Sequence, residues 1–401
     1  MVNRVDGDVL IVGAGPGGLT LANYLAACGI SFRVIDSLPE PVRDSRAHGF
    51  GARTLLALDM LGLAEPMLAA AKRPTPVLRE YYGTKLAAEL DFAASTPDPY
   101  PRILPIFQQR VVRVLDTALA ERGHHVEWLT GLVTFKMDHE GVTAEVDRNG
   151  IRDTIRTKWI VGCDGGRSTV RRTLGVEFRG ETSGLRFWGC ECDLDWKLSP
   201  DIWWTWHQRD GLASAIYNDF STKWHVMVLN LEGGEPSLEK MTVLLRRRSG
   251  IDTVQLSNPA WIRPVALSQL VADRFLTGRA ALVGDANHEF SSVAGQGLHF
   301  AIEDALNLGW KLALTISGSA APSLLQTYET ERRERVEDVF RKTRFIGRMF
   351  KLTGRSAKVL WATLYFVGKR FSSLSAVAAK QEGQLQTDYG KSPIVRQIPL
   401  R

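Results

Sequence analysis

The sequence predicts an α/β fold in which a Rossmann-like domain is interleaved with a β-sheet domain and is followed by C-terminal helices. Three observations predict this class. An apolar run at residues 9–12 breaks into a Gly13-x-Gly15-x-x-Gly18 motif and then into a helical pattern. Two stretches of short alternating strands, at residues 77–100 and 181–270, interrupt that pattern. The strand–helix pattern returns after each stretch, so two domains share one continuous chain.

The glycine motif has the spacing of a dinucleotide-binding turn. Gly13 allows the tight turn, Gly15 lets a pyrophosphate touch bare backbone, and Gly18 lets helix and strand pack closely. The helix N-terminus directs free N–H groups and the positive end of its dipole toward the phosphates. Asp36 ends the next strand, where a carboxylate can accept hydrogen bonds from an adenosine ribose and disfavours a 2′-phosphate. The residues predicted to contact the dinucleotide are Gly13, Gly15, Pro16, Gly17, Gly18 and Asp36.

Length and composition describe an ordinary globular enzyme. The chain has 401 residues, 44% hydrophobic and 23% charged, enough for two joined domains. A net charge of +6 is mild, so nucleic acid is not expected as a partner. Four cysteines without C-x-x-C spacing predict reduced thiols and no metal site. The first strand begins almost at once and no apolar run could span a bilayer, so we expect a cytoplasmic protein without stable membrane insertion.

The predicted domain boundaries follow the alternation of the two patterns. The first domain comprises residues 1–76, 101–180 and 271–345, and the β-sheet domain comprises residues 77–100 and 181–270. Residues 346–401 are expected to form a C-terminal helical segment. The sequence leaves the oligomeric state open.

Two further motifs belong to the first domain. The first, Cys163-Asp164-Gly165-Gly166-Arg167-Ser168-x-Val170-Arg171, follows a buried strand. The second begins with Gly284-Asp285-Ala286-Asn287-His288, continues through Gly295-Gln296-Gly297 and opens a strong helix. In this order the three motifs resemble those of the single-component FAD-dependent aromatic hydroxylases, the family of p-hydroxybenzoate hydroxylase and phenol hydroxylase. The resemblance covers about residues 6–345.

The resemblance implies an enzyme that holds FAD tightly but not covalently. NAD(P)H would reduce the flavin, O2 would add to give a C4a-hydroperoxide, and the distal oxygen would pass to an aromatic carbon. The β-sheet domain would shield this chemistry from water. No second dinucleotide fold is visible, so NAD(P)H is expected to bind transiently. The expected substrate is a small, flat aromatic, polycyclic or natural-product-like.

The resemblance also assigns contacts to the flavin. Asp285 ends a strand where its carboxylate reaches the ribityl hydroxyls, and the helix that begins near Gly297 directs its N-terminus at the N1–C2=O edge. Arg46 and Gln108 are carried over as further contacts; Gln108 is preferred to its neighbour because the following apolar residues then have the family's spacing. The other residues assigned to FAD are Asp164, Gly165, Gly295, Gln296 and Leu298.

The chain departs from the family pattern near the reactive edge of the flavin. Ser291 and Ser292 stand where a proline is usual, and His299 stands where an asparagine is usual. These departures motivate an alternative, a flavin oxidoreductase that catalyses oxidation, epoxidation or redox cyclisation without aromatic hydroxylation. A non-catalytic dinucleotide carrier is a further alternative, which the intact Asp285 disfavours.

A phenolic substrate reacts faster once deprotonated, so a base beside it would contribute to catalysis. His48 is the first candidate because it follows Arg46 closely, at a place where phenol hydroxylases have an aspartate. A loop histidine that is bonded only to backbone is the alternative. His225 and Tyr217, in the tryptophan-rich region, are weaker candidates.

Aromatic residues are the main candidates for the substrate pocket. Trp204 and Trp206 share one face of a predicted strand, and Trp224 lies on a neighbouring strand. They form either a pocket wall suited to a flat apolar substrate or an ordinary aromatic core. Ser292 and Val293, in the loop before the last glycine segment, complete the predicted pocket.

Overall fold

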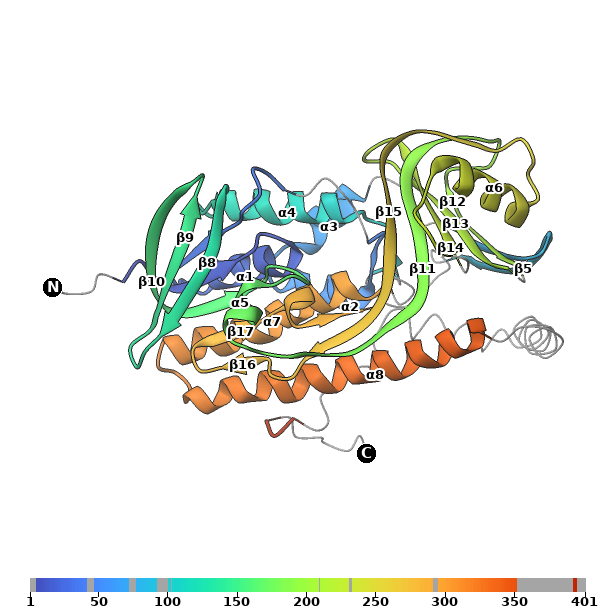
Figure 1. The fold of residues 1–401 in the computed structure, drawn as a ribbon. Helices are drawn as coiled ribbons and strands as arrows, with labels where there is room; N and C mark the ends of the chain where they lie inside the picture. The colour runs from blue at the N-terminus through green and yellow to red at the C-terminus, as the bar shows by residue number, and fades with distance from the viewer. Residues whose placement is uncertain are drawn as a thin grey trace, which may run out of the picture.

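The computed structural model describes residues 5–41, 47–71, 77–91, 100–101, 103–208, 210–230, 233–290, 295–351 and 392–394. Two lobes are visible (Figure 1), one with a central sheet surrounded by most of the helices and one built on a second sheet. Two long strands, β11 and β15, run from the first lobe into the second.

The first lobe is built on a mainly parallel sheet. Its order is β16-β17-β10-β1-β2-β7, and the strands β8 and β9 continue from β10. The central strand β1 pairs in parallel on both sides and buries its apolar run almost completely, as the sequence predicts. The strands are β1 (Gly7–Val12), β2 (Phe32–Ile35), β7 (Val126–Glu127), β8 (Thr130–Met137), β9 (Val142–Arg148), β10 (Ile151–Gly162), β16 (Leu276–Thr277) and β17 (Ala280–Leu282).

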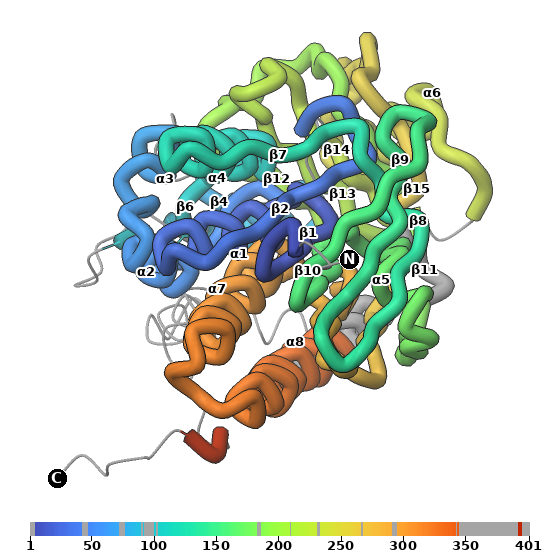
Figure 2. The backbone as a smooth tube through the Cα atoms, turned by 90° about the vertical axis from the view of Figure 1, so that its left-hand side faces the viewer, coloured from blue at the N-terminus to red at the C-terminus, as the bar shows by residue number. Residues whose placement is uncertain are grey.

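Helices pack against this sheet and against one another. α1 contacts both α4 and α7 and lies between them in Figure 2. α8 lies alongside α7, and a buried ion pair joins Arg332 Nε of α8 to Asp304 Oδ1 of α7 at 2.5 Å. The helices of this lobe are α1 (Pro16–Ala27), α2 (Ala52–Asp59), α3 (Ala64–Ala70), α4 (Gln108–Glu121), α5 (Thr169–Thr173), α7 (Gly297–Ile316) and α8 (Gln326–Lys351), with short 3-10 turns η1 (Gly284–Ala286) and η3 (Pro322–Leu325).

The second sheet has the order β18-β15-β11-β14-β13-β12-β4-β5. β4 and β5 come from early in the chain and join this sheet beside β12. β11 and β15 have 18 residues each, so the predicted boundaries near residues 180 and 270 fall inside these strands. The strands are β4 (Val77–Tyr82), β5 (Lys85–Asp91), β11 (Phe178–Asp195), β12 (Ile202–Gln208), β13 (Gly211–Asn218), β14 (Lys223–Asn230), β15 (Gln255–Ala272) and β18 (His288–Glu289); a separate pair is β3 (Phe50–Gly51) with β6 (Ile103–Leu104).

The second sheet has one buried face and one partly exposed face. Helix α6 (Leu238–Ser249) covers the buried face, where Trp204, Trp206 and Trp224 pack into the core of this lobe. Side chains alternate along a strand, so Trp203 and His225 point to the opposite face. The prediction of Trp204, Trp206 and Trp224 as a pocket wall is therefore corrected: they form the aromatic core that was the open alternative.

No helix in the described ranges is long and apolar enough to cross a membrane. Over the same residues, no group of three or more histidine, cysteine or acidic side chains could hold a metal ion. The four cysteines are free thiols. α8 includes the first residues of the predicted C-terminal segment, 346–401, and ends at Lys351. The rest of that segment lies outside the described residues, except for residues 392–394. Ser392 Oγ donates a hydrogen bond to Glu331 at 2.6 Å.

Candidate active site

The glycine turn between β1 and α1 has the geometry that the motif predicts. Gly13 has a φ of +104°, and a Cβ there would lie 2.4 Å from the carbonyl oxygen of Cys163. A Cβ on Gly18 would lie 1.9 Å from the carbonyl oxygen of Gly13, so helix and turn can approach only without a side chain. No described atom lies within 4 Å of a Cβ placed on Gly15, which leaves space above the backbone for a phosphate group.

Asp36 lies where the second strand ends and is held beside this turn. Its Oδ2 accepts the backbone N–H of Ala14 at 2.8 Å, and its Oδ1 accepts that of Leu38 at 2.9 Å. These bonds fix the direction of the carboxylate, and each oxygen can still accept a further hydrogen bond. The arrangement fits a ribose hydroxyl beside a pyrophosphate at the start of α1.

Asp164 provides a second acceptor close to the same sheet edge. Its Oδ2 accepts the backbone N–H groups of Thr169 and Val170, at 2.6 and 3.1 Å, at the start of α5. Its Oδ1 is buried and has no hydrogen-bond partner among the described residues. Burial raises the pKa of Asp164, and this effect outweighs the hydrogen bonds from Ser168 and from the backbone, which act to lower the pKa. A buried acceptor without a donor fits a ligand that brings a hydroxyl group.

The Gly284–Asp285 turn is fixed from behind by a buried carboxylate. Asp304 Oδ2 accepts the N–H of Gly284 at 3.0 Å and contacts His288 Nε2 at 2.7 Å. Both Asp304 and His288 are fully buried. Asp285 stands in front of this turn, and a Cβ on Gly297 would lie 3.7 Å from its Oδ1. Asp304 therefore holds the backbone that presents Asp285 to the N-terminus of α7.

The first turn of α7 meets the short strand β3. Gln296 is the N-cap residue, Gly297 begins the helix, and Leu298 is buried. His299 Nδ1 accepts the backbone N–H of Gly51 at 3.3 Å, and burial lowers the pKa of His299 to about 4. The N-terminus of α7, whose first N–H groups have no partner within the helix, therefore lies next to the loop that carries His48, three residues before Gly51.

Gln108 lies at the start of α4, on the other side of the same loop. Its backbone N–H donates to the carbonyl oxygen of Ala47 at 3.2 Å, which brings the start of α4 next to His48. The predicted contact Arg46 and the predicted pocket residues Ser292 and Val293 lie outside the described residues. The described part of the site thus gathers the start of α4, the His48 loop and the start of α7.

His48 and His225 meet across the two lobes. His48 Nε2 is in hydrogen-bond contact with His225 Nδ1, and the ring centroids are 4.5 Å apart. Phe107 and Trp203 present their rings edge-on to His48 at 5.3 and 5.8 Å. Burial lowers the pKa of His48 to about 4, and burial, His48 and then Arg263 hold the pKa of His225 well below its ordinary value. Both imidazoles are therefore neutral at pH 7, with one N–H between them.

Tyr217 is not part of this contact. It pairs with Trp224 across the strands, and the two rings pack edge-to-face at 5.4 Å on the side of the sheet that α6 covers. The structure therefore brings together two of the three candidate catalytic residues, His48 and His225, and places Tyr217 on the opposite face.

The partly exposed face of the second sheet carries residues that the sequence analysis did not single out. The new residues are Glu191 and Trp261, which form a cross-strand row with His225 on three neighbouring strands. Beside them lies a small apolar cluster that contains Met227. The signal that could have found this face is strand parity, because Trp203 must point away from the buried Trp204.

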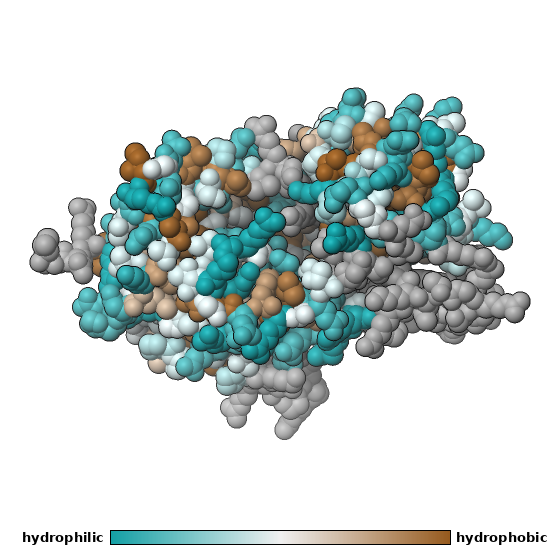
Figure 3. All heavy atoms as spheres, viewed as in Figure 1, coloured by the Kyte–Doolittle hydropathy of each residue, from teal (hydrophilic) through white to brown (hydrophobic). Residues whose placement is uncertain are grey.

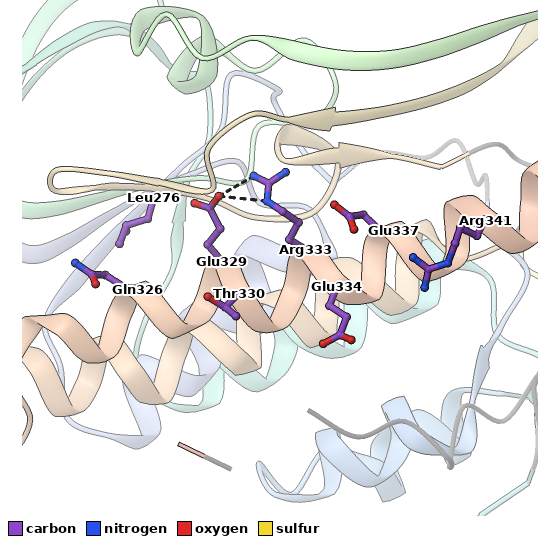
Figure 4. Close-up of a pocket in the computed structure, with 8 residues that line it drawn as sticks. All are labelled: Leu276, Gln326, Glu329, Thr330, Arg333, Glu334, Glu337 and Arg341. Carbon is purple, nitrogen blue, oxygen red and sulfur yellow. Dashed lines mark hydrogen bonds and ion pairs between the residues drawn. The ribbon is translucent and has the colours of Figure 1, made fainter. Parts of the chain in front are cut away.

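Hydrophilic and hydrophobic side chains are mixed over the face of both lobes that Figure 3 shows. A separate groove of about 510 Å³ lies between β16 and α8 (Figure 4). It is lined mainly by charged side chains of α8, including the ion pair between Glu329 and Arg333 at 2.7 Å. None of the predicted site residues lines this groove.

The glycine turn, the placed acids and the helix N-termini define a protein of the FAD-binding class. The family described as "FAD binding domain" matches residues 6–343. The chain belongs to this family, that of the FAD-dependent aromatic hydroxylases, which confirms the predicted family, fold class, enzyme class and FAD cofactor.

Three similar proteins illustrate the relationship. A flavin-dependent monooxygenase of Mycobacteroides abscessus is 35% identical over 81% of this chain and 70% of its own length. The 6-methylpretetramide 4-monooxygenase of Streptomyces rimosus is 32% identical over 83% of this chain and 60% of its own. The solved structure of the anhydrotetracycline hydroxylase OxyS of Streptomyces rimosus has a TM-score of 0.78 at 31% identity, covering 96% of this chain and 77% of that one. The chain thus spans 60 to 70% of the length of these two curated relatives.

Proposed function

We propose that the protein is an FAD-dependent monooxygenase that uses NAD(P)H and O2 to hydroxylate a phenolic, polycyclic aromatic substrate. The contact between His48 and His225 carries the proposal, because it lies where the flavin-side loop meets the partly exposed face of the second sheet. The names of two relatives, which specify 6-methylpretetramide and anhydrotetracycline, support a substrate of this size and kind.

The chain's own residues would hold FAD at both ends. Gly15 and the start of α1 would receive the pyrophosphate, with Asp36 at the adenosine ribose. Asp285 and the unpaired Oδ1 of Asp164 would accept hydrogen bonds from ligand hydroxyls. The start of α7 would face the flavin, where its N–H groups favour negative charge. Bound in this way, FAD supplies the transfer of electrons and oxygen that no side chain can provide.

His48 would contact the phenol of the substrate. If its Nε2–H donates to His225 Nδ1, the Nδ1 of His48 is left as an acceptor for the phenolic O–H. Neutral imidazole can accept that hydrogen bond at pH 7, whereas imidazolium cannot. The proposed role is therefore to orient the phenol and to assist its deprotonation.

Labelled oxygen provides the test. The purified, FAD-loaded protein would be mixed with NADH or NADPH and a panel of phenolic polycyclic compounds in the presence of ¹⁸O2. We expect a substrate that accelerates NAD(P)H oxidation and yields a product with one ¹⁸O atom. A product oxidised or cyclised without label would instead support the alternative oxidoreductase, which the position of His299 at the start of α7 keeps open.

We also propose that NADH or NADPH binds transiently and that the protein is cytoplasmic. The four free thiols support a reducing compartment. Measuring KM for NADH and NADPH in the same assay decides between the two co-substrates.

A further inference from the structure

A buried carboxylate lies next to the histidine pair. Glu191 is on β11, 3% exposed, between His225 on β14 and Trp261 on β15. Because the three residues are direct cross-strand neighbours, their side chains leave the sheet on the same face. This is the face on which His225 meets His48.

Glu191 is fully engaged in hydrogen bonds with neutral donors. Its Oε2 accepts the indole N–H of Trp261 at 2.9 Å. Its Oε1 accepts the amide of Asn218 at 2.9 Å and the hydroxyl of Ser221. Within the described ranges it forms no ion pair, so three charge-assisted hydrogen bonds compensate the cost of burying its charge.

Trp261 contacts both Glu191 and His225, and so connects the carboxylate to the histidine pair. Its ring packs edge-to-face against His225, with centroids 5.1 Å apart and an interplanar angle of 72°. The guanidinium of Arg263 lies 4.4 Å from the centre of the same indole. The indole is thus fixed by a hydrogen bond and by a cation, and its position limits the orientations open to the imidazole of His225.

The other partners of Glu191 fix a contact between the lobes. Asn218 is the last residue of β13, and Ser221 lies in the turn between β13 and β14. In the same turn, Asp219 Oδ2 accepts a hydrogen bond from Arg110 of α4 at 3.0 Å, and the guanidinium of Arg110 lies 5.4 Å from the ring centre of Phe220. One carboxylate therefore holds both the indole beside His225 and the turn that contacts α4.

We infer that Glu191 is a positioning residue that acts through the indole of Trp261 to orient His225 toward His48. Its effect on hydroxylation rests on the proposed function, whereas its effect on the orientation of His225 does not. Without an acceptor at residue 191, the buried indole N–H has no partner, and the ring shifts to find one. His225 then loses the fixed surface that keeps its Nδ1 directed at His48.

The test compares Glu191→Leu, Glu191→Gln and Trp261→Phe in the full-length, FAD-loaded protein. Leucine removes every acceptor. Glutamine can present its oxygen to the indole and its amide to Ser221, although it loses the hydrogen bond from Asn218. Because the contact with the indole is kept, Glu191→Gln should retain the wild-type orientation of His225. Phenylalanine keeps a ring but removes the N–H. Cys190→Ala is the matched control, because Cys190 is the adjacent residue of β11 and points into the core on the opposite face.

Two readouts decide the outcome. ¹⁵N–¹H NMR of the ring nitrogens should show one neutral tautomer of His225 in the wild type, Glu191→Gln and Cys190→Ala, and tautomer averaging in Glu191→Leu and Trp261→Phe. The yield of hydroxylated product per NAD(P)H should fall about tenfold in Glu191→Leu, less than the roughly 10²-fold loss that a misplacement of about 1 Å can cause. In a His225→Gln background the same substitution should cause no further loss.

Unchanged tautomer signals in Glu191→Leu, or an additional loss of yield in the His225→Gln background, would overturn the inference. If Glu191→Leu does not fold, Trp261→Phe decides it by the same signals, with averaging expected. If the wild type hydroxylates none of the phenols, the proposed function fails, while the NMR comparison still decides whether Glu191 positions His225.

Discussion

Replacing His48 by glutamine tests the proposed site most directly. Glutamine keeps a polar side chain of similar length but cannot take up a proton. Burial lowers the pKa of His48 from 6.5 to about 4, so protonating it in the folded protein costs roughly 3 kcal/mol more than in water. The neutral imidazole is therefore a weak base. General-base catalysis commonly increases a rate by 10²- to 10⁴-fold. For His48→Gln we expect a decrease in the hydroxylation rate near the lower limit, about 10²-fold.

The pH dependence gives the sign of the effect. His48 becomes protonated only as the pH falls toward 4, so the wild-type product yield should be constant between pH 6 and 8. In His48→Gln the yield should be low over this range and should rise toward the wild-type yield as the pH approaches about 10, where phenols ionise unaided. Unproductive turnover in the variant should appear as hydrogen peroxide.

The assay measures hydroxylated product, NAD(P)H and hydrogen peroxide together for the wild type, His48→Gln and a control. The control is His139→Gln, the same substitution at a histidine with 89% of its side chain exposed. Equal yields for the wild type and His48→Gln at every pH would remove His48 from the mechanism. Loss of flavin from His48→Gln would assign His48 to cofactor binding instead.

Three further substitutions test the cofactor site. Asp285→Ala should yield largely flavin-free protein, measured by absorbance after purification; stoichiometric flavin would show that the ribityl contact is misplaced. Asp304→Asn removes one of the two buried carboxylates that pair with Arg332, the other being Glu303, whose Oε2 lies 3.0 Å from Arg332 Nη1. Denaturant unfolding should therefore show a loss of about 3 kcal/mol, the lower end of the range for breaking a buried ion pair, with weaker flavin retention; an unchanged midpoint would contradict it. His299, whose pKa is about 4 when folded and 6.5 when unfolded, favours folding above pH 6.5 and loses this contribution as the pH falls to 4. His299→Gln should therefore lose about 2 kcal/mol less stability than the wild type between pH 7 and 4.5; parallel losses would refute this.

The cofactor cradle could be predicted from sequence because its signals are local. The turn at Gly13 needs a positive φ and the approach at Gly18 excludes a side chain, and both requirements are visible in a six-residue motif. The support behind the site could not be predicted in this way. Asp304 lies 20 residues beyond Gly284 and reaches its N–H only because α7 returns along the turn.

The assignment of the tryptophans depended on information that the sequence does not contain. Strand parity correctly places Trp204 and Trp206 on one face, but it does not say which face α6 covers. The contact between His48 and His225 is also invisible, because 177 residues separate them and neither belongs to a motif. Only the pairing of β11 with β14 and β15 brings His225 into its row with Glu191 and Trp261.

The two lobes are related to each other by covalent strands and by side-chain contacts that act together. β11 and β15, both strands of the second sheet, extend from one lobe into the other and pair along most of their length, which restricts bending between the lobes. Arg110 holds the β13–β14 turn to α4, and His48 holds β14 at a second place. Together, these two contacts restrict the angle between the lobes, which β11 and β15 connect, more firmly than either contact alone. The position of the partly exposed face of the second sheet relative to the His48 loop therefore depends on Arg110 and on the histidine pair. A substitution at either place should change the yield of hydroxylated product per NAD(P)H without altering a residue that is proposed to hold FAD.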